Sequence, residues 1–536
     1  MKIKTLYEKW NKSFFSMWGI FALVYLFIIC HFWWGNHDWK FIKYGVKFNS
    51  GFFEGRYSQH FFNCFLFDGQ ILPILLLVLS LAMIVIMGIM CASYFNLAKD
   101  RRYVTVLTLF IGLNPYLFSL IYYQHYLLAL TIWPILAIWL LMMTEKGFSW
   151  LRLLCGCIGY GILWGGYSPV LALSCCLFGI KNLCECRRET NSWKQSIRNG
   201  VFFVIQSIIG FLIYKIICFC LQENLYLNNN MYNLAVRTDE SLWGKFAENI
   251  WAAFSQFGHL YLYLNKEYAL FLILGLLAAL ICWGRQIKTQ RLLALCWLVE
   301  ICIGARLVFI FALHAAYAEF RLEYWSRLGM GIFMLTGLLF EKKNLWKNLV
   351  NLGLCLMFLL WVKTDLVIQK DWLVGWDGYR KYQARLGQRM EMYSGFDKTK
   401  HYTLFTLGMQ NFSDKFYPER NEFLRESKEM ENHHSFNFET GPNLFWEDKH
   451  KPFDLSCVNL GQQILIVPTE RTMPPLELDF EDIKNIREWL YFEADVYPNI
   501  NFLYVKDGIV VLVLDENDFN LNREKMLKNM EVGLKN

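Results

Sequence analysis

Two acidic residues between the first two apolar segments are candidates for acid–base chemistry. Asp38 follows the Trp33-Trp34 pair by a few residues, and Glu54 lies further along the same stretch. Because tryptophan is enriched at membrane–water interfaces, Asp38 is expected at the level of the lipid headgroups. A carboxylate there could accept the proton of an attacking hydroxyl that lies within about 3 Å. We assign Asp38 as the candidate catalytic base and Glu54 as the second choice; a solvated loop carboxylate is the alternative for Asp38.

Five basic residues could hold a phosphate or the sugar attached to it. An arginine lies within an apolar run at position 306, where a charge is costly and therefore points to a function. Guanidinium groups suit phosphate because their planar fork donates two parallel hydrogen bonds. The predicted binding residues are Arg56, His60, Arg306, Arg321 and Arg327. Ordinary contacts with lipid headgroups are the alternative for the last two.

Aromatic residues at helical spacing surround these charges. Phe53, Tyr57, Phe61 and Phe65 recur every four residues, so we expect them on one face of a helix that lies along the membrane surface. Arg56, Gln59, His60 and Asn63 then occupy the opposite, polar face. Such a helix carries Glu54 and Arg56 near its start and would bring both close to Asp38.

The composition predicts that these residues are positioned by segments that span a membrane. Of 536 residues, 55% are hydrophobic and 18% are charged, and several apolar runs reach the roughly 20 residues that cross a bilayer. The runs are continuous rather than alternating, which favours helices over a barrel. The net charge of +7 reflects membrane topology and gives no reason to expect nucleic acid as a partner. The predicted class is an α-helical polytopic membrane protein.

Apolar segments predict eleven spans. They fall near 14–34, 71–97, 104–122, 126–143, 150–166, 168–183, 200–221, 268–284, 292–313, 325–341 and 345–363. A single kinked helix through Gly165 to Pro169 would reduce the count to ten. With eleven spans, the basic clusters after spans two, six, eight and ten all face the cytoplasm, as basic loops usually do. This places the N-terminus inside, and the opening loop and C-terminus outside.

Two domains follow from the change in composition. Residues 1–364 form the membrane domain, and the polar residues 365–536 form an extracytoplasmic domain of mixed α/β structure. In it we expect helices over 376–392, 476–494 and 521–534, strands over 401–407 and 462–468, and a hairpin over 502–514 that turns at Asp507-Gly508. A further amphipathic helix is expected over 240–264, between spans seven and eight.

Neither a disulfide framework nor a metal site is predicted. Most of the sixteen cysteines lie within apolar runs, where cysteine behaves as a small hydrophobic residue. Cys184-Glu185-Cys186 has no second pair at zinc-ligand spacing, and His433-His434 is a weak metal candidate. No cofactor is expected, although a divalent metal stays possible.

The first 365 residues resemble a family of membrane enzymes. The resemblance consists of a first span, an acid in the outer loop, Gly55-Arg56 about seventeen residues later, and roughly eleven spans. The segments NPYLFSLIYYQHYLLAL (114–130) and WGGYSPVLAL (164–173) add to it. In these features the chain is similar to glycosyltransferases of GT-C architecture, above all to GtrII-type glucosyltransferases. Where that family has two adjacent acids, this chain has His37-Asp38, so a metal-binding role for the pair is in doubt.

The resemblance implies transfer of a sugar from a polyprenyl-phosphate carrier to a cell-surface polysaccharide or lipid-linked glycan on the outer face of the cell membrane. One base and a phosphate clamp fit an inverting single displacement. A transporter or flippase is the alternative, in which buried charges line a substrate path; transporters often carry internal repeats, and none is visible here. A non-catalytic assembly or receptor protein is a third reading.

Overall fold

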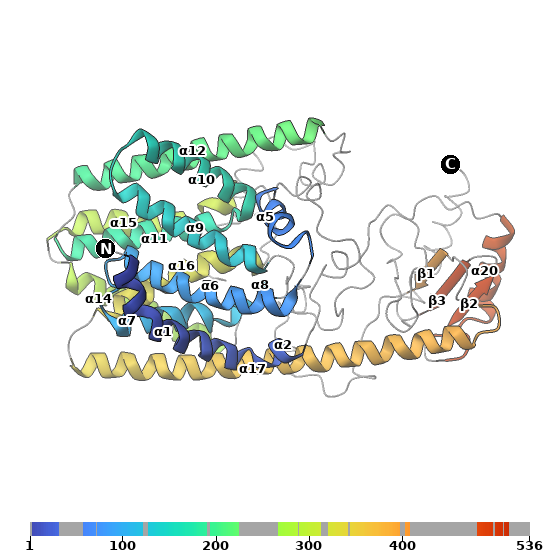
Figure 1. The fold of residues 1–536 in the computed structure, drawn as a ribbon. Helices are drawn as coiled ribbons and strands as arrows, with labels where there is room; N and C mark the ends of the chain where they lie inside the picture. The colour runs from blue at the N-terminus through green and yellow to red at the C-terminus, as the bar shows by residue number, and fades with distance from the viewer. Residues whose placement is uncertain are drawn as a thin grey trace. The chain divides into compact units, whose positions relative to one another are not determined.

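The computed structural model describes residues 3–31, 57–70, 72–121, 127–189, 193–224, 266–287, 289–311, 320–340, 344–396, 403–407, 480–496, 499–506 and 509–513 (Figure 1). The described residues fall into two compact units. Unit 1 contains the described residues up to Gln369, and unit 2 contains those from Lys370 onward.

Unit 1 is a bundle of helices (Figure 1). Its elements are α1 (Ile3–Val24), α2 (Leu26–Cys30), α5 (Tyr57–Phe67), α6 (Pro73–Tyr94), α7 (Arg101–Gly112), η1 (Pro115–Leu117), α8 (Phe118–Ile121), α9 (Leu127–Glu145), α10 (Trp150–Tyr167), α11 (Val170–Arg187), α12 (Trp193–Asn224), α14 (Lys266–Gln286), α15 (Arg291–Phe311), α16 (Phe320–Leu339) and the part of α17 (Asn344–Met392) up to Gln369.

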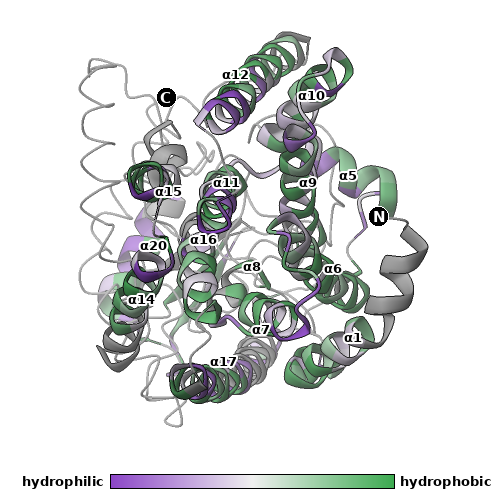
Figure 2. Ribbon diagram, turned by 90° about the vertical axis from the view of Figure 1, so that its left-hand side faces the viewer, coloured by the Kyte–Doolittle hydropathy of each residue, from purple (hydrophilic) through white to green (hydrophobic). Residues whose placement is uncertain are grey.

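Several helices have the length and composition of membrane spans. Among the described residues, Ile74–Tyr94, Trp193–Cys220 and Leu345–Val367 are long and apolar enough to cross a bilayer, and four shorter apolar helices accompany them. Exposed apolar side chains on α12 recur at Val204, Ile208, Leu212 and Ile216, which lie on one face of that helix. Figure 2 shows mainly apolar residues along the helices of this unit. An exposed apolar stripe on a long helix is typical of contact with lipid, so unit 1 is a helical membrane protein in its construction.

Contacts between helix ends define two ends of the bundle. At the first, α6 ends at Tyr94, and Arg188 at the end of α11 donates to the carbonyl of Phe95 over 2.9 Å. We call this the Lys181 end. At the opposite end, α6 begins at Pro73 and α5 packs against α10. We call this the His60 end.

The chain reverses between α10 and α11. Arg152 at the start of α10 donates to the carbonyl of Gly147, just after α9, over 2.8 Å. Lys181, near the end of α11, lies 3.4 Å from Glu145 at the end of α9. The beginning of α10 and the end of α11 therefore both lie at the Lys181 end, as two helices rather than one kinked helix. Pro169 at the N-cap of α11 explains the break, because proline lacks the N–H that a continuing helix needs.

The prediction of one continuous span over 104–122 was wrong. Helix α7 ends at Gly112, and a 3₁₀ turn and the short α8 follow it. Pro115 disfavours helical backbone at the preceding Asn114, which interrupts the helix. A side chain at position 112 would also meet the ring of Phe21 at 2.1 Å, so glycine permits the close approach of α1 and α7.

A break in the last helix was also predicted and is absent. The sequence predicted a span ending at 363 and a separate helix over 376–392, whereas α17 is one helix of 49 residues. The segment between the two predicted helices contains Gly375 but no proline. Glycine weakens a helix by about 1 kcal/mol without breaking it, whereas proline removes a hydrogen bond.

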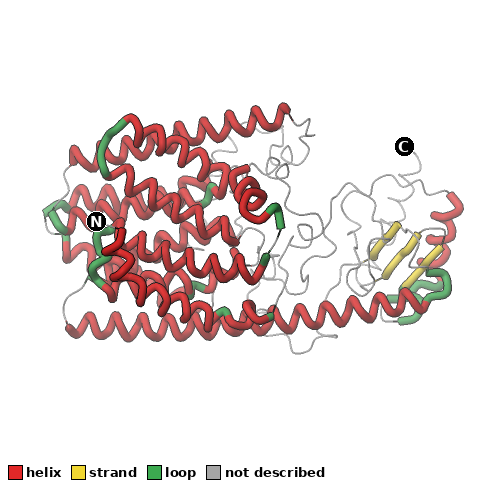
Figure 3. Tube along the Cα trace, viewed as in Figure 1, coloured by secondary structure: helices red, strands yellow, loops and turns green. Residues whose placement is uncertain are grey.

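Unit 2 contains a small sheet with a helix against it (Figure 3). The strands β1 (Thr403–Leu407), β3 (Ile509–Val513) and β2 (Leu503–Lys506) lie in the order β1-β3-β2, with β1 parallel and β2 antiparallel to β3. In α20 (Phe480–Phe492), Trp489 contacts Tyr504 with ring centroids 5.4 Å apart. The antiparallel pairing of the predicted hairpin, the strand at 403–407 and the helix near 480–492 are confirmed, and the predicted turn at Asp507-Gly508 lies outside the described residues. The predicted elements at 240–264, 462–468 and 521–534 lie outside the described residues.

Candidate functional site

Helix α5 lies at the His60 end and holds most of the polar side chains that the sequence singled out there. It packs against α10 and α9. Tyr57 donates from its hydroxyl to the carbonyl of Gly161 over 3.1 Å and stacks on Tyr214 at 6.0 Å. A side chain at position 165 would meet the Tyr57 ring at 2.4 Å, so Gly165 allows α5 to approach α10 closely. These contacts fix how α5 is rotated about its axis.

The rotation buries the polar face of α5. The sequence predicted that these residues share a face opposite the apolar one and did not predict the burial of that face. Gln59 and His60 have no exposed surface, and Asn63 is 4% exposed. Phe61 and Phe65 are exposed and stack on each other at 5.8 Å. One part of the prediction was wrong, because Tyr57 is buried among the polar residues rather than on the exposed apolar face. Its hydroxyl reaches a backbone carbonyl, which the aromatic spacing alone did not reveal.

The amide of Gln59 is a buried hydrogen-bonding group without a partner among the described residues. Neither its oxygen nor its nitrogen has a hydrogen-bond partner there. The indole nitrogens of Trp133 on α9 and Trp164 on α10 are likewise buried and without a partner. Burying such groups unpaired costs free energy, so native proteins pair nearly all of them with protein, water or ligand. These atoms are candidates for binding a polar ligand.

Aromatic rings surround this polar face. Phe62 contacts the Trp133 ring edge-on at 6.1 Å, and Trp164 stacks on Tyr214 at 6.2 Å. We call Tyr57, Ser58, Gln59, His60 and Asn63, together with Trp133 and Trp164, the α5 cluster. Amide groups beside indole and phenol rings can donate to and accept from hydroxyl groups while the rings cover apolar surface. This chemistry suits a ligand rich in hydroxyls.

The other predicted site residues have different outcomes. Arg327 on α16 is buried, with 3% of its surface exposed. It lies one turn further into the bundle than Tyr324. The hydroxyl of Tyr324 donates to the carbonyl of Ile111 over 3.4 Å. His60 and Arg327 therefore lie at the same end of the bundle. Helices α15 and α16 carry Arg306 and Arg321, but the description of these two residues is limited to their backbone. The predicted residues Asp38, Glu54 and Arg56 lie outside the described residues.

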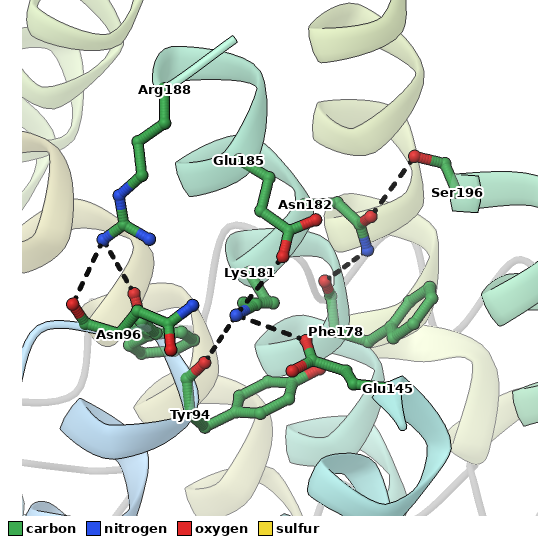
Figure 4. Close-up of polar contacts among 10 residues, drawn as sticks. Tyr94, Asn96, Glu145, Phe178, Lys181, Asn182, Glu185, Arg188 and Ser196 are labelled. Carbon is green, nitrogen blue, oxygen red and sulfur yellow. Dashed lines mark hydrogen bonds and ion pairs between the residues drawn. The ribbon is translucent and has the colours of Figure 1, made fainter. Parts of the chain in front are cut away.

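A second polar cluster, at the Lys181 end, was not predicted as a site (Figure 4). The amine of Lys181 is 2% exposed and lies 3.4 Å from Glu145 and 3.3 Å from Glu185. It also donates to the carbonyl of Tyr94 over 2.9 Å. A lysine ammonium has three donors, so these three acceptors match its capacity. We call Lys181, Glu145, Glu185 and the Tyr94 carbonyl the Lys181 cluster.

The Lys181 cluster explains how α6 ends inside the protein. The last carbonyls of a helix have no partner within the helix and carry a partial negative charge. Lys181 donates to the carbonyl of Tyr94. Arg188 donates to the carbonyls of Phe95 and Asn96 over 2.9 Å and 3.4 Å. Because these groups are paired with each other, we assign the cluster a structural role: it holds α6, α9 and α11 together.

Asp365 and Gln369 on α17 are buried polar residues that sequence reasoning missed. Both have no exposed surface, and both oxygens of the Asp365 carboxylate are without a hydrogen-bond partner in the described part of the chain. The sequence placed residue 365 at the start of the soluble domain, where an acid is unremarkable. The apolar residues Leu366, Val367 and Ile368 that follow it were the available signal that the span continues.

Comparisons with protein-family models, with curated proteins and with solved structures found no match to this chain. The functional argument therefore rests on the chain itself.

Proposed function

We propose that this protein is a membrane glycosyltransferase of the GT-C type. It moves a sugar, a hexose such as glucose, from a polyprenyl-phosphate carrier to a cell-surface glycan or lipid-linked acceptor on the outer face of the membrane. The observation that carries the proposal is the α5 cluster at one end of an apolar bundle. In it the amide of Gln59 and the indole nitrogens of Trp133 and Trp164 are buried among aromatic rings without a hydrogen-bond partner in the described chain.

A lipid-linked sugar matches both the apolar faces of the bundle and the polar groups of the α5 cluster. Its polyprenyl chain is as apolar as the exposed faces of the bundle, where Phe61 and Phe65 of α5 are exposed. Its sugar hydroxyls both donate and accept hydrogen bonds, as the Gln59 amide does. An amphipathic helix such as α5 therefore separates the two halves of the donor.

The proposed reaction is a single displacement with inversion. The acceptor oxygen forms a bond to the anomeric carbon while the bond from that carbon to the phosphate oxygen breaks. Asp38 takes the proton of the acceptor hydroxyl, with Glu54 as the second candidate base, and polyprenyl phosphate leaves with the electron pair. Cationic side chains stabilise the charge that develops on the phosphate. In the proposal these are Arg56, Arg306, Arg321 and Arg327, with His60 beside them.

The proposed topology has eleven crossing helices and the His60 end outside. The helix ends and loops that meet at the Lys181 end contain Arg102, Arg152, Arg187, Arg188 and Lys194. Basic residues concentrate on the cytoplasmic side of membrane proteins, which supports placing this end inside. The α5 cluster then faces the side on which cell-surface glycans are assembled.

Transfer from a radiolabelled polyprenyl-phosphate sugar in isolated membranes tests the proposal. Asp38→Asn is expected to abolish transfer while membrane insertion stays normal. Arg327→Lys keeps the charge but loses the planar fork, and we expect a rate roughly 100-fold lower, as when one charge-stabilising donor is removed. The matched control is Arg198→Lys, because Arg198 is an exposed arginine on α12. Full activity in Asp38→Asn would refute the assignment of the base.

A second preparation, of purified protein in lipid vesicles, separates transfer from transport. If purified protein in vesicles carries the labelled lipid from one leaflet to the other without releasing its sugar, the chain is a flippase and the proposed transfer is wrong.

A further inference from the structure

Asp365 and Gln369 lie one turn apart on α17 and point to a second site, separate from the α5 cluster. Both side chains have no exposed surface. Within the described chain, no lysine, arginine or histidine forms an ion pair with Asp365, and both of its carboxylate oxygens have no hydrogen-bond partner. An isolated buried carboxylate is so costly that proteins pair it, neutralise it or bind a cation to it.

The hydrogen-bond donors around Asp365 are already used by backbone carbonyls. Gln369 donates from its amide nitrogen to the carbonyl of Val24 over 2.8 Å and to that of Asp365 over 3.2 Å. Tyr25 donates to the carbonyl of Gly112 over 2.8 Å, and Tyr324 donates to that of Ile111. The amide oxygen of Gln369 is buried and has no partner among the described residues. On Asp365 and Gln369, the side-chain atoms left without partners are therefore hydrogen-bond acceptors.

The local electrostatics also favour a positive ligand. Gln369, one turn from Asp365, bonds the carbonyl of Val24, the residue before Tyr25. The hydroxyls of Tyr25 and Tyr324 bond the neighbouring carbonyls of Gly112 and Ile111. Those hydroxyls bond the last carbonyls of α7, and a helix C-terminus carries a partial negative charge. Negative or partially negative charge therefore gathers in one buried region, from the carboxylate, the Gln369 oxygen and the end of α7.

We propose that Asp365 and the Gln369 amide oxygen bind an alkali-metal cation, with the hydroxyl oxygens of Tyr25 and Tyr324 as further candidate ligands. Hard cations take oxygen ligands, and the ends of interrupted helices at membrane depth bind Na⁺ in other membrane folds. A single carboxylate balances a single positive charge, whereas magnesium and calcium sites usually gather more charge or more water. The cation would hold α17 against α1, α7 and α16. This proposal is independent of the sugar transfer.

Thermal unfolding of the purified full-length protein tests the site. NaCl is titrated against choline chloride at constant ionic strength and pH 8, because choline is too large for a buried site. A ligand that binds the folded state raises the Tm in a saturable manner. We expect such a rise in the wild type with Na⁺ and its loss in Asp365→Asn. Glu300→Gln is the matched control, because Glu300 also has a buried carboxylate oxygen without a partner but lies on α15, and it should keep the full response.

A second variant and a second readout keep the proposal testable if Asp365→Asn does not fold. Gln369→Met keeps the volume of the side chain but removes the amide oxygen, and it should raise the Na⁺ concentration at half-maximal effect at least tenfold. Binding of ²²Na⁺ to the wild type should be saturable. The proposal is overturned if Na⁺ raises the Tm no more than choline does, if Asp365→Asn responds like the wild type, or if no saturable ²²Na⁺ binding is found.

Discussion

Replacing Lys181 by methionine removes the cation that holds the Lys181 cluster together. Methionine keeps the length and most of the apolar stem of lysine but has no charge and no donor. Glu145 and Glu185 would then repel each other, and the carbonyl of Tyr94 would lose its bond to the lysine. The expected result is a large loss of stability with the fold of each helix unchanged.

The geometry sets the size of this loss. Removing one partner of a buried ion pair costs about 3–5 kcal/mol, because a charge is left buried and uncompensated. The side chains of Glu145 and Glu185 are 28% and 19% exposed, so water can solvate them in part and the lower end of that range applies. The lost hydrogen bond to the Tyr94 carbonyl adds about 1 kcal/mol. We therefore expect Lys181→Met to lower the free energy of unfolding by about 4 kcal/mol.

Compensating variants show whether the cause is the charge. In the triple variant Lys181→Met, Glu145→Gln, Glu185→Gln the cluster is neutral, and we expect stability within about 2 kcal/mol of the wild type, since neutral replacement of a buried ion pair is often tolerated. Lys194→Met is the control, because Lys194 is an exposed lysine at the start of α12. Its effect should stay within about 0.5 kcal/mol.

The assay is equilibrium unfolding of the purified protein in mixed micelles with increasing denaturing detergent. The reasoning is refuted if Lys181→Met unfolds at the same detergent fraction as Lys194→Met. It is also refuted if the triple variant is no more stable than Lys181→Met, because the loss would then come from packing rather than from uncompensated charge.

Three further predictions concern the elements around the α5 cluster. Gly165→Val should displace α5, because a side chain there meets the Tyr57 ring at 2.4 Å; the Tm should fall by several degrees and transfer should be lost, whereas Gly19→Val, with nothing within 4 Å of the added carbon, should leave both unchanged. His60→Gln should lower transfer at least tenfold in the radiolabel assay, and equal activity in both proteins would remove His60 from the site. Phe65→Ala should leave thermal stability in detergent unchanged, because this ring is 75% exposed, and a drop in Tm of several degrees would show that it is buried instead.

Sequence patterning predicted the features of this protein that follow from local rules. The spacing of Phe61 and Phe65 against Gln59 and His60 predicted which face of α5 is apolar, because side chains three or four residues apart share a helical face. The hairpin of β2 and β3 followed from two strand-like runs on either side of Asp507-Gly508. These predictions needed no knowledge of which helices are neighbours.

What the sequence did not reveal depends on partners distant along the chain. Lys181 lies in the predicted span 168–183 as an isolated charge, and its partner Glu145 and the Tyr94 carbonyl belong to other helices. Asp365 looked like an ordinary residue after the last span, and its burial depends on α1 packing over it through the bond from Gln369 to Val24. Tyr57 fitted the apolar spacing, yet the carbonyl of Gly161 places its hydroxyl inside the bundle.

The most direct test of the proposed function is a measurement of polyprenyl lipids in cells that lack this protein, because it does not require the acceptor to be known. Lipids are extracted with and without prior treatment of intact cells with a sugar-oxidising reagent that does not cross membranes. We predict that a polyprenyl-phosphate hexose accumulates and that the reagent modifies it, which places the unused donor on the outer face. Absence of accumulation, or accumulation of a donor that the reagent cannot reach, would contradict the proposed function.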